Sequence, residues 1–421
     1  MRDHYDIIIV GGGLSGACAA ISAARLGKSV MLIEAFNCLG GAAVTDLVIP
    51  FMPNNTQDPV TKERIELSAG LYLEILNGLH ALDASLAPWR ECFNEESLKL
   101  LLNRMTLQAG VELLLNSTLT SVKVSDEYIK SVTVSGVSGS MELYADYFID
   151  ATGDGNLAFM SGCDFVLGRE SDGRCQPMTL CFRLGSVNME NYRKIKDQIN
   201  PLWARLRSEG KITNPRENLL IFNTVSENIL HFNSTRIVGL DPTDVAELTK
   251  AEIMAREQVF EIVAFLRDNF PSAFKDAVIL STGMRIGVRE SRKIVCKYTL
   301  TKEDIIGCCR FDDSIALCNY DIDIHSPDGT GTSHYYFKDG EYYSIPYRSL
   351  LPKGISNLII TGRCIGATHE AQASLRIMPV CCTLGQAAGA AAALSSDSGT
   401  AVGDINTSTL RDILLSQGAN I

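Results

Sequence analysis

Residues 5–16 read Tyr-Asp-Ile-Ile-Ile-Val-Gly-Gly-Gly-Leu-Ser-Gly, a strand-like apolar run that leads directly into Gly11-x-Gly13-x-x-Gly16. An alanine-rich stretch of helical character follows, and a second β-rich run ends at Glu34. Strand, glycines, helix, strand and acidic residue in this order are typical of the βαβ unit that binds a dinucleotide. The stretch therefore predicts a Rossmann-type α/β domain at the start of the chain.

Each residue type in this motif has a physical reason. Gly11 allows a tight turn, Gly13 lets a pyrophosphate approach the backbone, and Gly16 lets the helix pack closely on the strand. The diphosphate then lies at a helix N-terminus, where free N–H groups favour negative charge. Glu34 is expected to accept hydrogen bonds from a ribose hydroxyl. The alternative, a glycine-rich turn in an ordinary α/β protein, leaves the order of the elements unexplained.

Length and composition set limits on the class of protein. The chain has 421 residues, 46% of them apolar and 21% charged, as expected for a globular protein of two or three domains. A net charge of −11 argues against a surface for nucleic acid or for an anionic membrane. A small anionic substrate stays possible, because a local cluster of arginines can override the overall charge.

The cysteines and the apolar segments bear on location. Thirteen scattered cysteines without a C-x-x-C pair do not resemble a disulfide framework, a dithiol centre or a metal site. No secretory signal precedes the first strand, so we expect a cytoplasmic protein. The apolar stretch 380–394 is too short for a membrane span and predicts a buried helix.

Two later stretches repeat the pattern of an apolar strand that runs into glycines: residues 147–155, ending in Asp-Ala-Thr-Gly-Asp-Gly, and residues 358–363. Short β runs between 111 and 144 predict an inserted β-meander. We therefore expect a discontinuous domain over 1–170 and 341–421, with a second, α+β substrate or cap domain over 171–340.

Several further elements are expected from the sequence pattern. Helices are predicted over 67–79, from an N-cap at Asn94 to about 110, from an N-cap at Asp241 or Thr243 to 269, and from about Pro379. In the second domain, 175–184 and 218–225 read as strands.

Together the segments at 11–34, 40–41, 150–155 and 358–363 resemble the glutathione-reductase-type FAD-binding fold, in the branch that carries an inserted substrate domain. The segments at 285–292, 321–325, 345–352 and 362–371 sharpen the resemblance. They are similar to the large bacterial family of FAD-dependent oxidoreductases, over nearly the whole chain.

This resemblance implies FAD as the cofactor and gives individual residues a role. The diphosphate would be held at Gly11, Gly13, Ser15 and Gly16, and the adenosine ribose by Glu34. Gly40, Gly41 and Thr45 would pass near the diphosphate or the isoalloxazine, Asp154 would bond the ribityl or diphosphate region, and Gly362 and Arg363 would line the cofactor. The helix that begins near Pro379 would direct its N-terminus at the flavin pyrimidine, where reduced flavin carries negative charge.

The catalytic candidates follow from the same resemblance. His369 suits proton transfer beside the flavin, with a structural histidine as the alternative. Arg376 would bind a substrate carboxylate or the flavin O2, with a structural salt bridge as the alternative. His325 and His334 flank a Gly-rich loop that could form a lid. A thioether tether through Cys38 is a further alternative to non-covalent FAD.

Arg289 belongs to a cluster with Arg285 and Arg292, which would share one face if the segment were helical. Such a face would form either an anion clamp or an ordinary salt-bridge surface. A strand at 284–287 would split the cluster instead.

The predicted function is dehydrogenation or reduction of a small polar substrate, a carboxylate or a hydroxylated compound, by hydride transfer at flavin N5. No second GxGxxG motif occurs between 156 and 350, so a dedicated NAD(P)H domain is not expected and the electron acceptor is unknown. The alternative from another class is a flavin-binding subunit that relays electrons to a protein partner. A non-redox enzyme with FAD as a structural element is a third hypothesis. A homo-oligomer is possible, and no nucleic acid, membrane span or metal site is expected.

Overall fold

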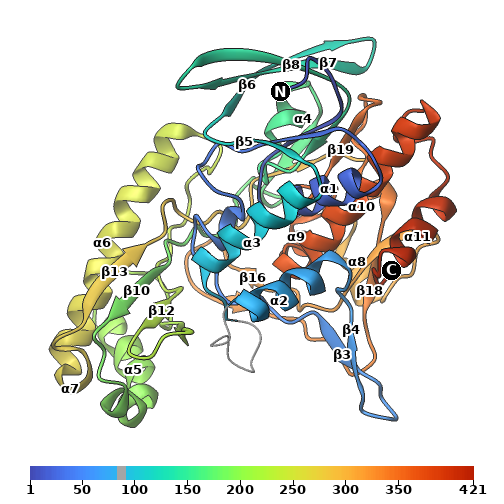
Figure 1. Cartoon of the computed structure of the whole chain (residues 1–421). Helices are drawn as coiled ribbons and strands as arrows, with labels where there is room; N and C mark the ends of the chain where they lie inside the picture. Colours follow the sequence, from blue (N-terminus) through green and yellow to red (C-terminus); the bar gives the residue numbers. More distant parts are fainter. Residues whose placement is uncertain (83–91) are drawn as a thin grey trace.

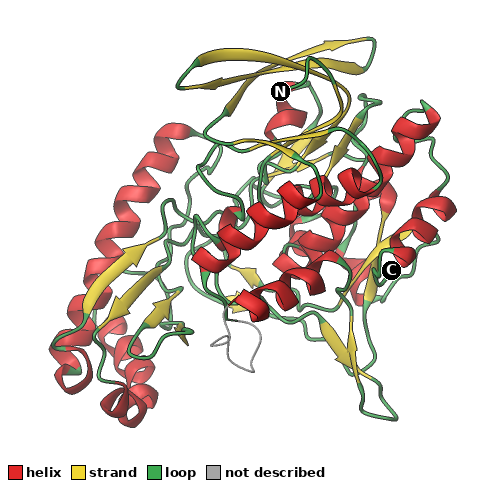
Figure 2. Ribbon diagram, viewed as in Figure 1, coloured by secondary structure: helices red, strands yellow, loops and turns green. Residues whose placement is uncertain are grey.

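The computed structural model describes residues 1–82 and 92–421 and shows two packed units (Figure 1). Trp89 and Arg90, for which the sequence predicts packing alone, lie outside the described residues. The larger unit contains the N-terminal motif, and the smaller unit, with the long helix α6 (Val245–Asn269), lies at the left of the view. Figure 2 shows strands at the top, in the centre, in the smaller unit and in a hairpin at the lower right.

The larger unit is built on a seven-stranded sheet of order β5-β2-β1-β8-β7-β6, with β19 also paired to β8. Pairing is parallel from β5 through β8 and to β19, and antiparallel at β7 and β6. These strands are β1 (Tyr5–Val10), β2 (Val30–Ile33), β5 (Glu112–Leu114), β6 (Thr118–Ser125), β7 (Tyr128–Gly136), β8 (Gly139–Asp150) and β19 (Leu358–Ile360). The mixed α/β architecture with a Rossmann-type parallel centre confirms the predicted fold class.

Strand β8 joins the two parts of this sheet. Its first half pairs with β7, where Val132 lies opposite Leu143, and its second half pairs with β1, where Ile9 lies opposite Ile149. The sequence predicted that the β runs of the meander end at 144 and that a separate strand begins at 147. That prediction is wrong because β8 continues through the exposed polar residue Asp146. Before Asp146 the strand pairs with β7 of the meander, and after it the strand is buried in the core.

Two helices cover the centre of the sheet and pack on each other: α1 (Leu14–Arg25) and α10 (Met378–Ser398). A Cβ on Gly385 or Gly389 would collide with the backbone of α1 at Ser15 or Ala19, so these glycines allow the helices to touch. Helix α10 is longer than the predicted apolar stretch and has the length and composition of a membrane span, but 83% of its apolar window is buried inside the protein. It is a core helix.

The smaller unit has its own apolar core, which runs from Met178 to Val288 and includes the fully buried Trp203. Its sheet has the order β11-β12-β10-β13. The elements are β10 (Phe182–Gly185), β11 (Ile221–Asn223), β12 (Leu230–Phe232), β13 (Val278–Thr282), α5 (Met189–Ser208), α6 and α7 (Pro271–Phe274). We call this unit the cap. The predicted domain boundaries at 170 and 340 stay predictions, although apolar residues from Ile294 onward pack with the larger core.

The predicted helix near 241–269 is present, but its N-cap is Asp244, whose carboxylate accepts from the N–H groups of Ala246 and Glu247. Asp241 instead caps a preceding turn at Thr243. The predicted strand 175–184 is reduced to β10, because its first residues form only isolated bridges from Met178 and Thr179. Asn94 is confirmed as the N-cap of the helix that follows it.

The remaining elements surround these two units. They are β3 (Asn55–Gln57), β4 (Arg64–Glu66), β9 (Phe165–Leu167), β14 (Arg292–Ile294), β15 (Ser314–Cys318), β16 (Ile324–His325), β17 (Thr332–Ser333), β18 (Tyr343–Pro346), α2 (Leu71–Leu82), α3 (Glu95–Gln108), α4 (Asn156–Met160), α8 (Lys302–Ile306), α9 (His369–Leu375), α11 (Thr407–Ser416) and the short 3-10 turns η1 (Gly41–Ala43) and η2 (Tyr347–Leu350). The helix predicted over 67–79 begins later and continues past 79, because Gly78 packs against Leu101 of α3 inside the helix.

Candidate active site

The site lies at the carboxyl edge of the parallel strands. Val10 of β1 is in register with Ile33 of β2 and with Asp150 of β8, and Asp150 is in register with Ile360 of β19. Parallel strands that end together bring the segments that follow them to one place. The segments beginning at residues 11, 34, 151 and 361, distant in sequence, therefore meet at this edge.

The glycines of the first motif have different surroundings. Gly11 has φ +103°, and a Cβ there would collide with the backbone of Ala151. A Cβ on Gly16 would collide with the carbonyl of Gly11. At Gly13, in contrast, an added Cβ would meet nothing closer than the Cα of Gly41 at 3.8 Å, and Gly13 lines a cavity. Gly13 thus provides the open backbone that a diphosphate needs, and Gly11 and Gly16 provide close packing.

Two helix N-termini face this cavity without a capping side chain. They belong to α1, with N-cap Gly13, and α10, with N-cap Ile377. Helices α3, α5, α6, α9 and α11 are all capped by an Asn, Asp or Thr side chain. Uncapped N-terminal N–H groups bind anions, so both termini fit the anionic parts of FAD, the diphosphate and the flavin pyrimidine.

Glu34 follows β2 and is 7% exposed. Its carboxylate accepts hydrogen bonds from the N–H groups of Gly12, at 2.5 Å, and Phe36, at 2.9 Å. These two bonds hold the carboxylate beside the glycine turn, at the position where a ribose is expected. Its predicted contact with the ribose stays a prediction.

The other predicted cofactor residues surround the same turn. Gly40 and Gly41 have positive φ, and the N–H of Gly40 donates to the carbonyl of Gly12 at 2.9 Å. The hydroxyl of Thr45 donates to the carbonyl of Gly41 and to Asp46. Ser15 and Thr361 share a hydroxyl–hydroxyl bond of 2.7 Å that ties α1 to the end of β19.

Asp154 and Arg363 form an ion pair of 2.6 Å. The same carboxylate accepts a hydrogen bond from Ser291, and it stays ionised because, although burial opposes ionisation, the charge of Arg363 lowers its pKa. Arg363 and Gly362 line the cavity, whereas Asp154 is absent from its lining. Asp154 is therefore placed to orient Arg363, and its predicted direct bond to FAD is untested.

A cavity of about 570 Å³ lies between the larger unit and the cap. The larger unit contributes Gly13, Ser15, Gly40, Gly153, Gly362, Arg363, Arg376 and Met378 to its walls, and the cap contributes Thr179, Cys181, Arg216, Leu220, Phe222 and Asn233. The segments 287–289, 320–325 and 332–334 close it. A cavity shared by dinucleotide glycines and cap side chains can hold a cofactor and a substrate together.

His325 and Asp323 form a buried pair in this cavity. Nε2 of His325 is 3.3 Å from Oδ2 of Asp323, and Nδ1 is 3.3 Å from the hydroxyl of Thr332. Burial and the positive charge of Arg289 lower the pKa of His325 to about 3. Although burial opposes ionisation of Asp323, its bond to His325 and the charges of Arg376 and Arg289 hold its pKa below the usual value. At neutral pH a neutral imidazole with its proton on Nε2 therefore faces an ionised Asp323.

Besides Arg363, which is paired with Asp154, three further arginines line the cavity: Arg289, Arg376 and Arg216. Arg289 donates to the carbonyl of Pro177 and to side-chain oxygens of Thr179 and Asn233. Arg376 donates to Gln176 and to backbone carbonyls. These acceptors are neutral, and none of the three arginines forms an ion pair with a carboxylate of the described residues.

The uncompensated charge has an electrostatic consequence. Burial together with the charges of Arg376 and Arg216 lowers the pKa of Arg289 to about 9. The carboxylate of Asp323 opposes this effect, and it is already paired with His325. The cavity therefore carries an excess of positive charge, although the whole chain has a net charge of −11.

Of the two alternatives for Arg285, Arg289 and Arg292, the shared helical face is wrong and the cluster is split. Residues 284–291 form an irregular extended segment, which bridges to Thr179 at Gly287, and Arg292 begins β14. The extended path sends the three side chains apart: Arg285 pairs with Asp46 at 2.8 Å and Arg292 lies over the ring of Phe159. Of this cluster, Arg285 and Arg292 have these partners, and Arg289 lines the cavity.

His369 does not line the cavity. It is 2% exposed at the start of α9, and its Nδ1 lies 2.8 Å from the carboxylate of Glu290, which also pairs with the buried Lys293. This places His369 in a buried charge network that ties α9 to the segment before β14. Its predicted part in catalysis is untested, and the structure gives it structural partners.

Cys38 is likewise buried, at 7% exposure, outside the cavity walls, and burial raises the pKa of its thiol. All thirteen cysteines are free thiols, and the described residues contain no group of three or more His, Cys, Asp or Glu side chains suited to a metal ion.

Sequence reasoning missed several polar residues of the cavity, among them Asp323 and Arg216. Asp323 could have been found, because Asp321, Asp323 and His325 alternate along the chain and alternate residues of an extended segment share a face. Arg216 sits in an irregular segment, Asn-Pro-Arg-Glu-Asn, whose pattern carries no signal of its position.

Comparison with known proteins places the chain in a family. Over 50 residues, 12% of the chain, it is 48% identical to a soluble pyridine nucleotide transhydrogenase of Mycobacterium bovis, and the match spans only 10% of that relative's length. A geranylgeranyl bacteriochlorophyll reductase-like protein from Thermoplasma acidophilum is similar in structure over 99% of this chain and 84% of that one, with 12% identity and a TM-score of 0.48. A p-nitrophenol 4-monooxygenase from Pseudomonas putida matches over 99% and 85%, with 10% identity and a TM-score of 0.45.

The family model described as FAD dependent oxidoreductase matches residues 6–414, nearly the whole chain. This match agrees with the open turn at Gly13 and with the two uncapped helix termini at the cavity, and it makes FAD the cofactor. The chain belongs to the FAD dependent oxidoreductase family.

Proposed function

We propose that this flavoenzyme dehydrogenates or reduces a small carboxylate substrate by hydride transfer at flavin N5. The observation that carries the proposal is the cavity that combines the cofactor glycines with arginines lacking a carboxylate partner among the described residues. A substrate carboxylate supplies the missing negative charge, and charge-assisted hydrogen bonds to guanidinium groups are strong.

Arg289 and Arg376 would hold the carboxylate. Arg376 directly precedes the N-terminus of α10, so a carboxylate bound there lies close to the position of the flavin pyrimidine. Arg289 is held in place by Thr179 and Asn233 of the cap. Bound FAD supplies the two-electron acceptor or donor.

His325 would exchange the proton. Its Nδ1 accepts a hydrogen bond from the hydroxyl of Thr332, which a substrate hydroxyl would replace, while Nε2–H points at Asp323. In the oxidation direction, the substrate hydroxyl gives its proton to Nδ1 as the adjacent C–H loses a hydride and a carbonyl forms. The ionised Asp323 stabilises the imidazolium that results.

The test is anaerobic bleaching of the flavin by a panel of 2-hydroxy acids, with the matching neutral alcohols and methyl esters as controls. We expect acids to reduce the flavin and esters to fail. His325→Gln should slow flavin reduction about 100-fold or more without loss of bound FAD, because general acid–base groups contribute roughly 10²- to 10⁴-fold. His4→Gln, at an exposed position outside the cavity, is the matched control.

Equal reduction by acids and esters would contradict the proposal. No reduction by any small substrate, together with reduction by a protein donor, would favour the alternative of an electron-relay subunit. Cytoplasmic location and homo-oligomer formation stay predictions of the sequence.

A further inference from the structure

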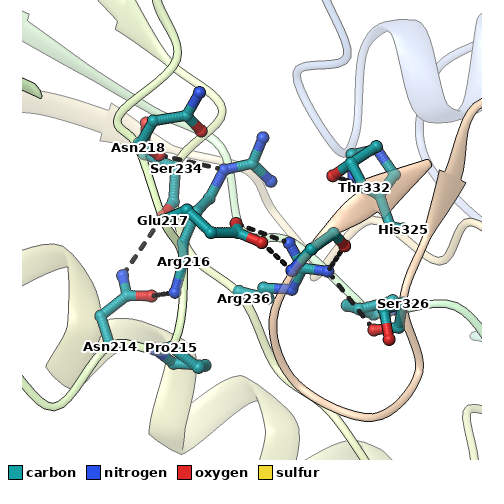
Figure 3. A network of polar contacts seen from close by, with 12 residues as sticks. Asn214, Pro215, Arg216, Glu217, Asn218, Ser234, Arg236, His325, Ser326 and Thr332 are labelled. Atoms are coloured by element: carbon teal, nitrogen blue, oxygen red, sulfur yellow. Dashed lines mark hydrogen bonds and ion pairs between the residues drawn. The ribbon is translucent and has the colours of Figure 1, made fainter. Parts of the chain in front are cut away.

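Arg216 is a buried guanidinium with unused donors. It is 3% exposed and lines the cavity from the cap side. Its Nε donates to the carbonyl of Asn218 at 3.2 Å, but its two terminal nitrogens have no hydrogen-bond or ion-pair partner among the described residues. In Figure 3 a dashed line joins the Arg216 side chain to Asn218, and no dashed line reaches the two terminal nitrogens. Such donors need an acceptor, because a buried charge without one is costly.

The position of Arg216 is fixed by its neighbours. Its backbone N–H donates to Asn214 at 3.0 Å, and its carbonyl accepts from the indole of the fully buried Trp203 at 2.9 Å. Asn214 is itself held by Glu261 of α6 and by the carbonyl of Ser234. The guanidinium is therefore presented to the cavity on a preorganised segment, as binding groups are.

The acidic residue next to it is not its partner. The carboxylate of Glu217 binds Arg236 at 3.2 Å and the N–H of Gly331 (Figure 3). Burial and the positive charge of Arg236 lower the pKa of Arg216 to about 10, which still leaves it charged at neutral pH. The charges of Glu217 and Asp323 offset part of this effect, but no carboxylate of the described residues is bonded to the guanidinium.

Arg216 and Arg376 enter the cavity from different units. Arg376 precedes α10 of the larger unit, and Arg216 belongs to the cap segment between α5 and β11. One substrate carboxylate at Arg376 and Arg289 leaves the donors of Arg216 unused. Resting on the proposed function, we infer that the substrate is a dicarboxylate, with its first carboxylate at Arg376 and Arg289 and its second at Arg216.

The test measures binding rather than turnover. The holoenzyme is titrated with acid pairs of equal carbon number (succinate and butyrate, glutarate and valerate, adipate and hexanoate), and binding is followed by the change in the flavin absorption spectrum. In the wild type we expect one dicarboxylate to bind roughly 10- to 100-fold more tightly than its monocarboxylate, the range for one charged hydrogen-bonded pair.

Arg216→Gln should remove this preference and leave monocarboxylate affinity within about twofold. Arg216→Lys, which keeps the charge, should retain part of the preference even if the Gln variant does not fold. Arg205→Gln, on the exposed face of α5, is the matched control and should keep the full preference.

The outcomes separate the two proposals. If the wild type binds each monocarboxylate as tightly as its dicarboxylate, the dicarboxylate inference is overturned and the proposed function stands. If the preference survives in Arg216→Gln, the role of Arg216 is overturned. If no carboxylate of either kind binds, the proposed function fails and the inference fails with it.

Discussion

Gly13 and Gly16 belong to one motif, but the space around them differs. Substitution is therefore expected to weaken FAD binding at Gly13 and to disturb folding at Gly16. A side chain at Gly13 would project into the cavity from an extended backbone of φ −62°, which any residue adopts. We expect Gly13→Val to fold as the wild-type apoprotein does and to bind FAD at least about 100-fold more weakly, which corresponds to about 2.7 kcal/mol. Flavin content after purification and titration of apoprotein with FAD measure this.

Gly16→Val is the matched comparison. Its Cβ would collide with the carbonyl of Gly11, so helix α1 cannot keep its place on the strand, and the apoprotein should lose several degrees of thermal stability or fail to fold. A Gly13→Val protein that retains a full complement of FAD would refute the assignment of this turn to the cofactor.

His231 makes folding stability depend on pH. It is fully buried in β12, neither ring nitrogen has a partner in the described part of the chain, and burial lowers its pKa to about 3. Between pH 6.5 and 3 the unfolded chain binds a proton that the folded chain does not, so stability falls as pH falls. One such group contributes up to about 1.4 kcal/mol per pH unit.

We therefore expect His231→Leu to reduce the loss of stability between pH 6.5 and 4.5, measured by urea unfolding at several pH values. His4→Gln, at an exposed histidine, is the control and should leave the slope unchanged. An identical pH dependence of wild type and His231→Leu would show that the buried imidazole is protonated in the folded state.

At the scale of elements, both members of an ion pair of the cap, Arg236 and Glu217, hold the hairpin of β16 and β17 by hydrogen bonds. Arg236, 1% exposed, donates to the carbonyls of Ser326 and Gly331, and Glu217 binds Arg236 and the N–H of Gly331 (Figure 3). His325 lies in the first strand of this hairpin. The pair therefore controls how firmly the proposed proton acceptor is held.

Glu217→Gln leaves the buried Arg236 without its negative partner. We expect faster amide hydrogen exchange in peptides covering 324–333, and a several-fold higher KM for the acid substrate with unchanged FAD content. Glu227→Gln, at an exposed position of the same cap, should change neither quantity. Unchanged exchange in the hairpin of Glu217→Gln would show that backbone pairing alone holds it.

Elements with a strong local signal were predicted well from the sequence. The first βαβ unit, the Asn94 cap and the helix at Pro379 each depend on neighbouring residues, so their pattern was sufficient. The errors occurred where distant contacts decide. Residues 284–291 have helical spacing of arginines, but pairing at Thr179 and the ion pair with Asp46 hold them extended.

At the scale of the whole molecule, the sequence predicted which edge of the sheet carries the site but not which side chains complete it. The glycine turns all follow parallel strands, so their convergence follows from topology. Arg216 belongs to the cap, and no pattern in the sequence indicates how the cap packs on the larger unit. The partly buried Glu95–Arg183 pair, 2.6 Å long, joins α3 to β10 and is one of the contacts that fix this packing.

The two units have separate apolar cores but share one cavity, and this predicts how FAD affects unfolding. FAD that binds only the folded protein stabilises it by about 2.7 kcal/mol at a concentration of 100 Kd. Because cap residues line the cavity, unfolding of the cap should respond as well as unfolding of the larger unit. The chain has two tryptophans, and in Trp89→Phe the emission of Trp203 reports on the cap core alone.

We expect the unfolding midpoint of the Trp203 signal to rise with FAD concentration, in step with the midpoint of the far-UV circular dichroism signal. Gly13→Val in the same background is the control, and its midpoint should not move. If FAD raised only the circular dichroism midpoint while the Trp203 midpoint stayed constant, the cap would unfold independently of the cofactor. The shared cavity would then not couple unfolding of the two units. Binding of FAD would leave unchanged the cap arginines that are proposed to bind the substrate.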